Sequence, residues 1–250
     1  MSGHSRWSTI KRKKGAADAV RGKIFTKLSK EITVAARMGG GDPTGNPRLR
    51  LAIQAARAAA MPMDNVSRAI KKGTGELDGG QIEELVYEGY GPGGVAFIIE
   101  ITTDNQNRTI AEVRSIFDKA GGNLGKLGSV AFIFSKLGTI RYDGAKYSED
   151  KVMEAALEAG AQDVKTEADH VVVYTTPSEF HAVKEALDKA GLEALEAQLT
   201  MVPNNTVRLD EDMARRTLSL VEKLEDNDDV QKVFANFDIS DEILSRLSES

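Results

Sequence analysis

The sequence contains no cysteine among its 250 residues. Disulfide bonds, thiolate zinc sites and cysteine nucleophiles are therefore excluded, and the absence is compatible with a reducing cytoplasm. Aromatic residues make up only 6% of the chain and include one tryptophan, so we expect no broad platform for stacked bases. No apolar run approaches the length needed to cross a bilayer. The composition predicts a cytoplasmic protein with no membrane partner.

Motifs of catalysis are also missing. The three histidines, His4, His170 and His181, are far apart in sequence and have no metal-ligand spacing. Neither a nucleophile elbow nor a glycine-rich phosphate-binding motif occurs. We therefore predict that the protein is not an enzyme and has no catalytic residue, metal site, cofactor or small-molecule substrate. A hydrolase with a site built from carboxylates alone remains a third alternative, because such sites leave little trace in a sequence.

Positive charge is concentrated at the start of the chain. Residues 1–75 contain 16 Lys and Arg against 4 Asp and Glu, a net charge of +12. Residues 76–250 contain 17 against 34, a net charge of −17. A basic segment of this kind is typical of a surface that binds a polyanion, most commonly nucleic acid. We therefore expect nucleic-acid contacts mainly from the N-terminal third.

The candidate nucleic-acid-binding residues come from three places. Cations crowd an N-terminal arm and the helix after it, where Trp7 could stack on a base or pack against the protein. A short third helix adds further cations and, with Asn65, gives a weak helix-turn-helix signal. Two arginines near the start of a later helix exceed what helix capping requires. The full set is Arg6, Trp7, Lys11, Arg12, Lys13, Lys14, Arg21, Lys23, Lys27, Lys30, Arg68, Lys71, Lys72, Arg108 and Arg114.

Hydrophobic periodicity predicts a helical domain over residues 1–78. A basic arm is followed by three helices, and Asn46-Pro47 has the pattern of an N-cap with proline at the first helical position. Gly73 is the predicted end of the third helix. The predicted helices are 16–38, 47–60 and 63–72.

From residue 79 the pattern changes to alternating strands and helices, which predicts a middle α/β domain over 79–136 and 204–240. Phe132 and Phe134 share a face of one predicted strand, where burial is expected and base stacking is left open. The acidic stretch 225–229 is predicted to be a solvated loop, and binding of a cation or a basic partner is the alternative. Two glycine-rich stretches, 91–94 and 121–125, are predicted turns. The predicted strands are 85–90, 95–102, 129–134 and 230–237, and the predicted helices are 107–120 and 211–224.

Residues 137–203 have the order strand-helix-strand-strand-helix-strand, which is the ferredoxin-like unit. Because it separates the two halves of the middle domain, we expect it to be an insertion. Residues 241–250 are a predicted polar, frayed tail. The fold class is therefore α/β (α+β) with three domains. The elements of the insertion are expected at 138–142, 148–159, 163–167, 170–175, 177–190 and 192–202.

Several motifs in the chain resemble the YebC family. The similarity covers essentially the whole chain and departs at the motif positions only at Arg6, where lysine is common. The motifs are Gly3-His4-Ser5-Arg6-Trp7, Ile10-Lys11, Arg21-Gly22-Lys23-Ile24-Phe25, Gly39-Gly40-Gly41-Asp42-Pro43, Arg68-Ala69-Ile70, Tyr87-Glu88-Gly89-Tyr90-Gly91-Pro92-Gly93-Gly94, Asp104-Asn105-Gln106-Asn107-Arg108-Thr109, Glu112-Val113-Arg114 and Gly121-Gly122-Asn123-Leu124-Gly125.

The resemblance implies the same three-domain arrangement and a regulatory function. Members are described as probable transcriptional regulators that bind DNA in the bacterial cytoplasm. A mitochondrial branch resembles translational activators, and bacterial relatives are implicated in relieving ribosome stalling. We therefore expect a non-enzymatic nucleic-acid-binding regulator of gene expression of the DNA-binding type. The alternative is a ribosome-associated translation factor that binds ribosomal RNA.

Overall fold

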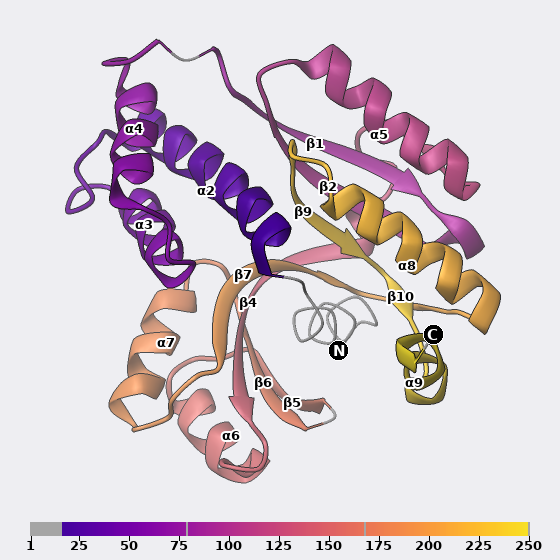
Figure 1. Ribbon diagram of the computed structural model, residues 1–250. Coiled ribbons are helices and arrows are strands. Elements are labelled where there is room, and N and C mark those ends of the chain that lie inside the picture. Colours follow the sequence, from indigo (N-terminus) through magenta and orange to yellow (C-terminus); the bar gives the residue numbers. More distant parts are fainter. Residues whose placement is uncertain (1–16, 79, 168, 250) are drawn as a thin grey trace.

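A computed structural model describes residues 17–78, 80–167 and 169–249. Figure 1 shows a group of N-terminal helices, a sheet accompanied by long helices, and a second sheet with shorter helices. The protein is therefore a mixture of helix and sheet that begins with a helical region, as predicted. The predicted arm lies outside the described residues.

The N-terminal helices form a unit around the longest of them. α3 (Pro47–Ala58) and α4 (Met63–Thr74) both pack against α2 (Ala17–Gly39). Their core joins large side chains such as Ile32 and Leu49 to alanines, which let the helices approach closely. The first two predicted helices are confirmed to within two residues at each end.

Asn46 fixes the turn between α2 and α3. Its side-chain oxygen accepts a hydrogen bond from Leu49 N at 3.1 Å, which confirms the predicted N-cap. Its amide nitrogen donates to Ala35 O at 2.7 Å and to Gly40 O at 2.9 Å. One buried side chain therefore satisfies the end of one helix and the beginning of the next.

The predicted end of the third helix is wrong. α4 continues through Gly73 to Thr74, and the left-handed residue that ends it is Gly75, with φ +83°. Gly73 serves a different purpose, because a β-carbon there would lie 2.4 Å from Thr33 O and 2.7 Å from Ala36 Cβ. The missing side chain lets α4 contact the backbone of α2.

The middle sheet is antiparallel, with the strand order β3-β1-β2-β9. α5 (Gln106–Ala120) and α8 (Glu211–Glu225) pack against it, and Phe97, Phe117 and Leu220 lie fully buried in the shared core. β2 is central and almost entirely buried, as its apolar sequence predicted. β9 returns to this sheet from beyond the third domain, as expected for an insertion. The strands are β1 (Glu83–Tyr90), β2 (Ala96–Thr103), β3 (Asn123–Leu124) and β9 (Val230–Ala235).

The predicted strand over 129–134 is wrong. Ala131–Ile133 form a single 3-10 turn, and the next strand, β4 (Phe134–Asp143), belongs to the third domain's sheet. Phe132 and Phe134 therefore share no strand face. The side chain of Phe134 is buried, whereas Phe132 is 73% exposed.

Buried Glu88 explains why this segment is no strand. Its carboxylate accepts hydrogen bonds from Gly128 N at 2.7 Å, Val130 N at 2.6 Å and Ala131 N at 3.0 Å. These are amides that a strand would need for a neighbouring strand. Burial alone would raise the pKa of Glu88, but the three amides together lower it.

The third domain has the predicted order of elements. Its sheet order is β5-β6-β4-β7 with antiparallel neighbours, which is the ferredoxin-like arrangement. Its second helix begins three residues later than predicted, because residues 177–179 form a turn in which Thr176 Oγ1 accepts from Glu179 N at 3.2 Å. The remaining elements are α6 (Glu149–Glu158), β5 (Asp163–Glu167), β6 (His170–Thr175), α7 (Phe180–Lys189) and β7 (Glu196–Pro203).

The predicted frayed tail is wrong as well. α9 (Asp241–Glu249) is a helix, and Leu244 is buried in the core of the middle domain, with Ile243 packed beside it. Before it, β10 (Phe237–Asp238) pairs in parallel with β8 (Val207–Arg208). The apolar residues of the last ten positions thus cover the end of the core. The residue boundaries of the domains at 78, 136 and 203 stay predictions.

Candidate nucleic-acid interface

The lysines of α2 contact the acidic turn Glu225–Asp229 between α8 and β9. Lys23 Nζ lies 3.0 Å from Asp226 Oδ1, and Lys27 Nζ donates to Glu225 O at 2.7 Å. Lys30 Nζ donates to Asp228 O at 2.8 Å and to Asp229 Oδ1 at 2.5 Å. Because this turn begins at the C-terminal end of α8, the helix dipole also favours cations there. The predicted solvated loop is therefore a docking site for the N-terminal domain.

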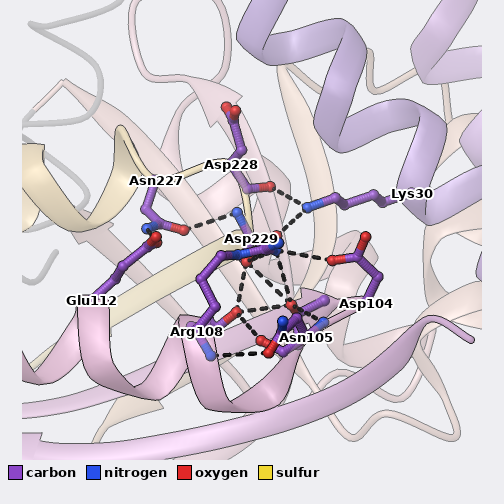
Figure 2. A network of polar contacts seen from close by, with 10 residues as sticks. Lys30, Asp104, Asn105, Arg108, Glu112, Asn227, Asp228 and Asp229 are labelled. Carbon is purple, nitrogen blue, oxygen red and sulfur yellow. Dashed lines mark hydrogen bonds and ion pairs between the residues drawn. The ribbon is translucent and has the colours of Figure 1, made fainter. Parts of the chain in front are cut away.

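Asp229 is the centre of this contact (Figure 2). Its side chain is only 5% exposed and accepts hydrogen bonds from Arg108 at 2.8 Å and Thr109 Oγ1 at 2.6 Å, besides Lys30. Thr103 Oγ1 completes the set at 3.1 Å. Four donors from three segments of the chain thus converge on one carboxylate.

The donors around Asp229 change its electrostatics. Burial alone would raise the pKa of Asp229, but hydrogen bonds from Arg108, Lys30 and Thr109 outweigh burial and hold the pKa well below its usual range. The same contact, together with Asp104 at 2.9 Å, raises the pKa of the Arg108 guanidinium. Asp229 is therefore ionised at neutral pH.

The helix-start segment before α5 supplies part of this site. Asn105 is the N-cap of α5, and its side-chain oxygen accepts a hydrogen bond from Arg108 N at 3.0 Å. Thr109 Oγ1 donates to Asp229 across the domain core. The glycine-rich stretch 91–94 forms a 3-10 turn, as predicted, and Gly121 is the left-handed residue that ends α5. The predicted turn over 121–125 is only partly right, because Asn123–Leu124 form β3.

A second group of cations lies on α3 and α4 and is exposed. We call these residues the free cations, because no hydrogen bond or ion pair joins their side chains to any part of the chain that the structure describes. Their neighbour Arg48 differs, since it pairs with Glu31 at 2.7 Å and Glu84 at 2.6 Å. The free cations are Arg50, Arg57, Arg68, Lys71 and Lys72.

The structure separates the predicted binding residues into distinct groups. Arg68, Lys71 and Lys72 belong to the free cations, whereas Lys23, Lys27 and Lys30 join the N-terminal domain to the middle domain. Arg108 pairs with Asp104 and Asp229 within the middle domain. Arg21, at the start of α2, also has a contact within the chain. Arg114 is exposed on α5. Outside the described residues are Arg6, Trp7, Lys11, Arg12, Lys13 and Lys14.

Sequence reasoning missed Arg50 and Arg57. They lie seven residues apart on one face of α3, and only this periodicity could have singled them out. The sequence leaves a basic partner for the acidic stretch 225–229 open, but it does not single out Asp229, whose partner Lys30 lies 199 residues away in sequence. No local pattern marks such a pair.

The described residues lack both a metal-binding cluster and a membrane-spanning helix. Among them, no three His, Cys, Asp or Glu side chains gather in a group that could hold a metal ion. None of their helices combines the length and apolar character required to traverse a bilayer.

Comparisons with known proteins give the family. A family model described as the TACO1/YebC protein N-terminal domain matches residues 5–76, and a model of the TACO1/YebC second and third domain matches residues 82–237. Proteins named probable transcriptional regulatory protein match along nearly their entire length. One from Syntrophus aciditrophicus is 59% identical over 249 residues, covering 99% of this chain and 100% of the relative.

Other relatives and a solved structure agree. A protein of the same name from Treponema denticola is 58% identical and covers 96% of this chain and 97% of its own. The crystal structure of a conserved hypothetical protein from Aquifex aeolicus superposes with a TM-score of 0.80 at 50% identity, covering 92% of this chain and 95% of that one. The chain therefore belongs to the TACO1/YebC family.

Proposed function

We propose that the protein is a non-enzymatic, cytoplasmic regulator of gene expression that binds DNA through its N-terminal domain. One observation carries the proposal: within the part of the chain that the structure describes, the free cations of α3 and α4 have no carboxylate partner, although the chain as a whole is acidic. Unpaired cations on adjacent helices can replace the counterions condensed on a phosphate backbone. The names of the relatives support a regulatory role.

The N-terminal arm would extend this surface. Its cations, including the run Lys11-Arg12-Lys13-Lys14, would add phosphate contacts, and Trp7 could stack on a base. Lys23, Lys27 and Lys30 would instead hold the N-terminal domain against the middle domain, and Arg108 would stabilise the middle domain, because carboxylate or carbonyl oxygens already occupy them.

A ribosome-associated translation factor is the second candidate. The free cations are spread over two helices. Asn65, which contributed to the helix-turn-helix signal in the sequence, is half-buried. Reading a sequence from one recognition helix requires several exposed side chains at base edges. Contacts with phosphates alone suit structured ribosomal RNA as well as DNA.

The test combines ribosome co-sedimentation with selection of bound DNA from a random pool, both at about 150 mM salt. Replacing Arg68, Lys71 and Lys72 together by alanine should lower nucleic-acid affinity at least about tenfold, because three phosphate contacts are lost. The matched control replaces Lys146, Lys165 and Lys189, three ion-paired lysines of the third domain, and should leave affinity unchanged.

The outcomes separate the two candidates. Enrichment of one DNA sequence without ribosome association supports the transcriptional regulator. The translation factor is supported if the protein co-sediments with ribosomes, the triple alanine variant of α4 does not, and DNA binding is unselective. Equal losses in the α4 variant and in the control would refute binding through the N-terminal domain.

A further inference from the structure

α3 and α4 enclose a groove on the N-terminal domain. Both helices make their close backbone contacts with α2 rather than with each other, which leaves a space between them. The pocket measures about 580 Å³, which is within the range of small-ligand sites. It is lined by side chains from these helices, from the loop before α3 and from the turn after α4.

The bottom of the groove is apolar. Ile53 from α3 and Val66 from α4 are 8% and 2% exposed and line the pocket together with half-buried Ile70. Met63 stands at the edge and is 52% exposed. Contacts with phosphates would need none of these groups, so the groove offers a flat apolar group a place to be buried.

Cations surround this apolar bottom. Arg50 and Arg57 lie two turns apart on α3, about 10 Å along the helix, and Lys71 faces them from α4. All three are among the free cations. The one carboxylate in the lining, Glu76, accepts a hydrogen bond from Thr74 Oγ1 at 2.9 Å. The occupant should therefore be anionic at its periphery and apolar at its centre.

We propose that the groove seats an unstacked base of a single-stranded nucleic acid, whose flanking phosphates contact Arg50, Arg57 and Lys71. The inference rests on the proposed function and deepens it. A duplex keeps its bases stacked inside, whereas a single strand can present a base face to an apolar surface. The chain's own arm does not suit the site, because residues 1–16 contain five Lys and Arg and no Asp or Glu.

A variant that fills the groove tests the inference. Ser67 is exposed and lines the pocket, so Ser67→Phe would block it without changing the net charge. Ala55→Phe is the matched control, because Ala55 is exposed on α3 outside the lining. The probes are a fluorescein-labelled ten-nucleotide oligo(U) and a 20-base-pair mixed-sequence DNA duplex, measured by anisotropy with the full chain at about 150 mM KCl.

Ser67→Phe should weaken oligo(U) binding about tenfold or more, because the contact of one base is lost. It should change duplex affinity less than about twofold, and Ala55→Phe should change neither. If Ser67→Phe lowered the affinity for both probes equally, or for neither, binding of a base in the groove would be refuted and the proposed function would stand. If the unaltered protein bound neither probe, the proposed function itself would fail.

A charge variant keeps the inference testable if Ser67→Phe folds poorly. Arg50→Ala with Arg57→Ala should weaken oligo(U) more than duplex, whereas Arg68→Ala with Lys72→Ala, outside the groove, should weaken both equally. A decaglutamate peptide that binds more tightly than oligo(U), in a manner sensitive to Ser67→Phe, would show that the groove takes an acidic peptide. A dimer that Ser67→Phe dissociates would show that it takes a second copy, and either result overturns the inference.

Discussion

Two groups of cations in the N-terminal domain carry the same sign of charge but have opposite surroundings. Lys23, Lys27 and Lys30 on α2 contact the acidic turn Glu225–Asp229, whereas the free cations of α3 and α4 have no carboxylate partner in the described part of the chain. The difference shows that a local excess of positive charge in a sequence can have two different structural roles. Part of it binds the protein's own acidic body, and the remainder is available to other polyanions.

The largest effect is expected from removing the carboxylate that binds Lys30 of α2. Asp229→Ala leaves the Lys30 and Arg108 charges without their buried partner, which should lower the free energy of unfolding by about 3 kcal/mol. In a chain of this size the melting temperature should fall by roughly 6–12 °C. Differential scanning calorimetry and urea denaturation would measure both quantities.

Asp226→Ala is the control, because its pair with Lys23 is exposed and should contribute less than about 1 kcal/mol. Acid gives a second check. Since folding lowers the pKa of Asp229, its ionisation stabilises the fold above the unfolded pKa of about 3.9, and this stability is lost as the pH falls through the folded value. The stability difference between the protein and Asp229→Asn should therefore shrink below about pH 4. A difference that persists unchanged would contradict the electrostatic account.

The separation of the two groups also depends on how closely α4 approaches α2. Gly73→Ala places a methyl group 2.4 Å from Thr33 O, so the helices must move apart at a cost of about 2 kcal/mol. Gly22→Ala is the matched control, because the same change in α2 meets nothing within 4 Å and should stabilise the helix by up to about 1 kcal/mol. Urea midpoints shifted in the same direction by both variants would refute the close-packing argument.

The fold was largely predictable where its causes are local. The N-cap Asn46, the burial of the apolar β2 and the order of elements in the third domain all follow from short sequence patterns. The errors have distant causes. Glu88 takes the amides of a segment 40 residues away and prevents a strand, and the core of the middle domain buries Leu244 of the predicted tail.

The candidate site divides in the same manner. The basic bias of residues 1–75 could be read directly, and it includes the free cations Arg68, Lys71 and Lys72. It could not separate them from Lys30, because the partner of Lys30 is Asp229, nearly 200 residues further along the chain. Whether a cation is paired depends on residues that are distant in sequence. Composition therefore predicts the region that binds but not the individual binding residues.

The salt dependence of nucleic-acid binding gives the finest test of the two groups. Lys72→Ala should reduce the slope of log K against log salt for a DNA duplex by about 1, because one phosphate contact is lost. Lys27→Ala should leave the slope unchanged, because its ammonium group already donates to Glu225 O. Anisotropy titrations between about 50 and 200 mM KCl would resolve the difference. Equal reductions in both variants would mean that DNA displaces the acidic turn from α2, and the two groups would then form one binding surface.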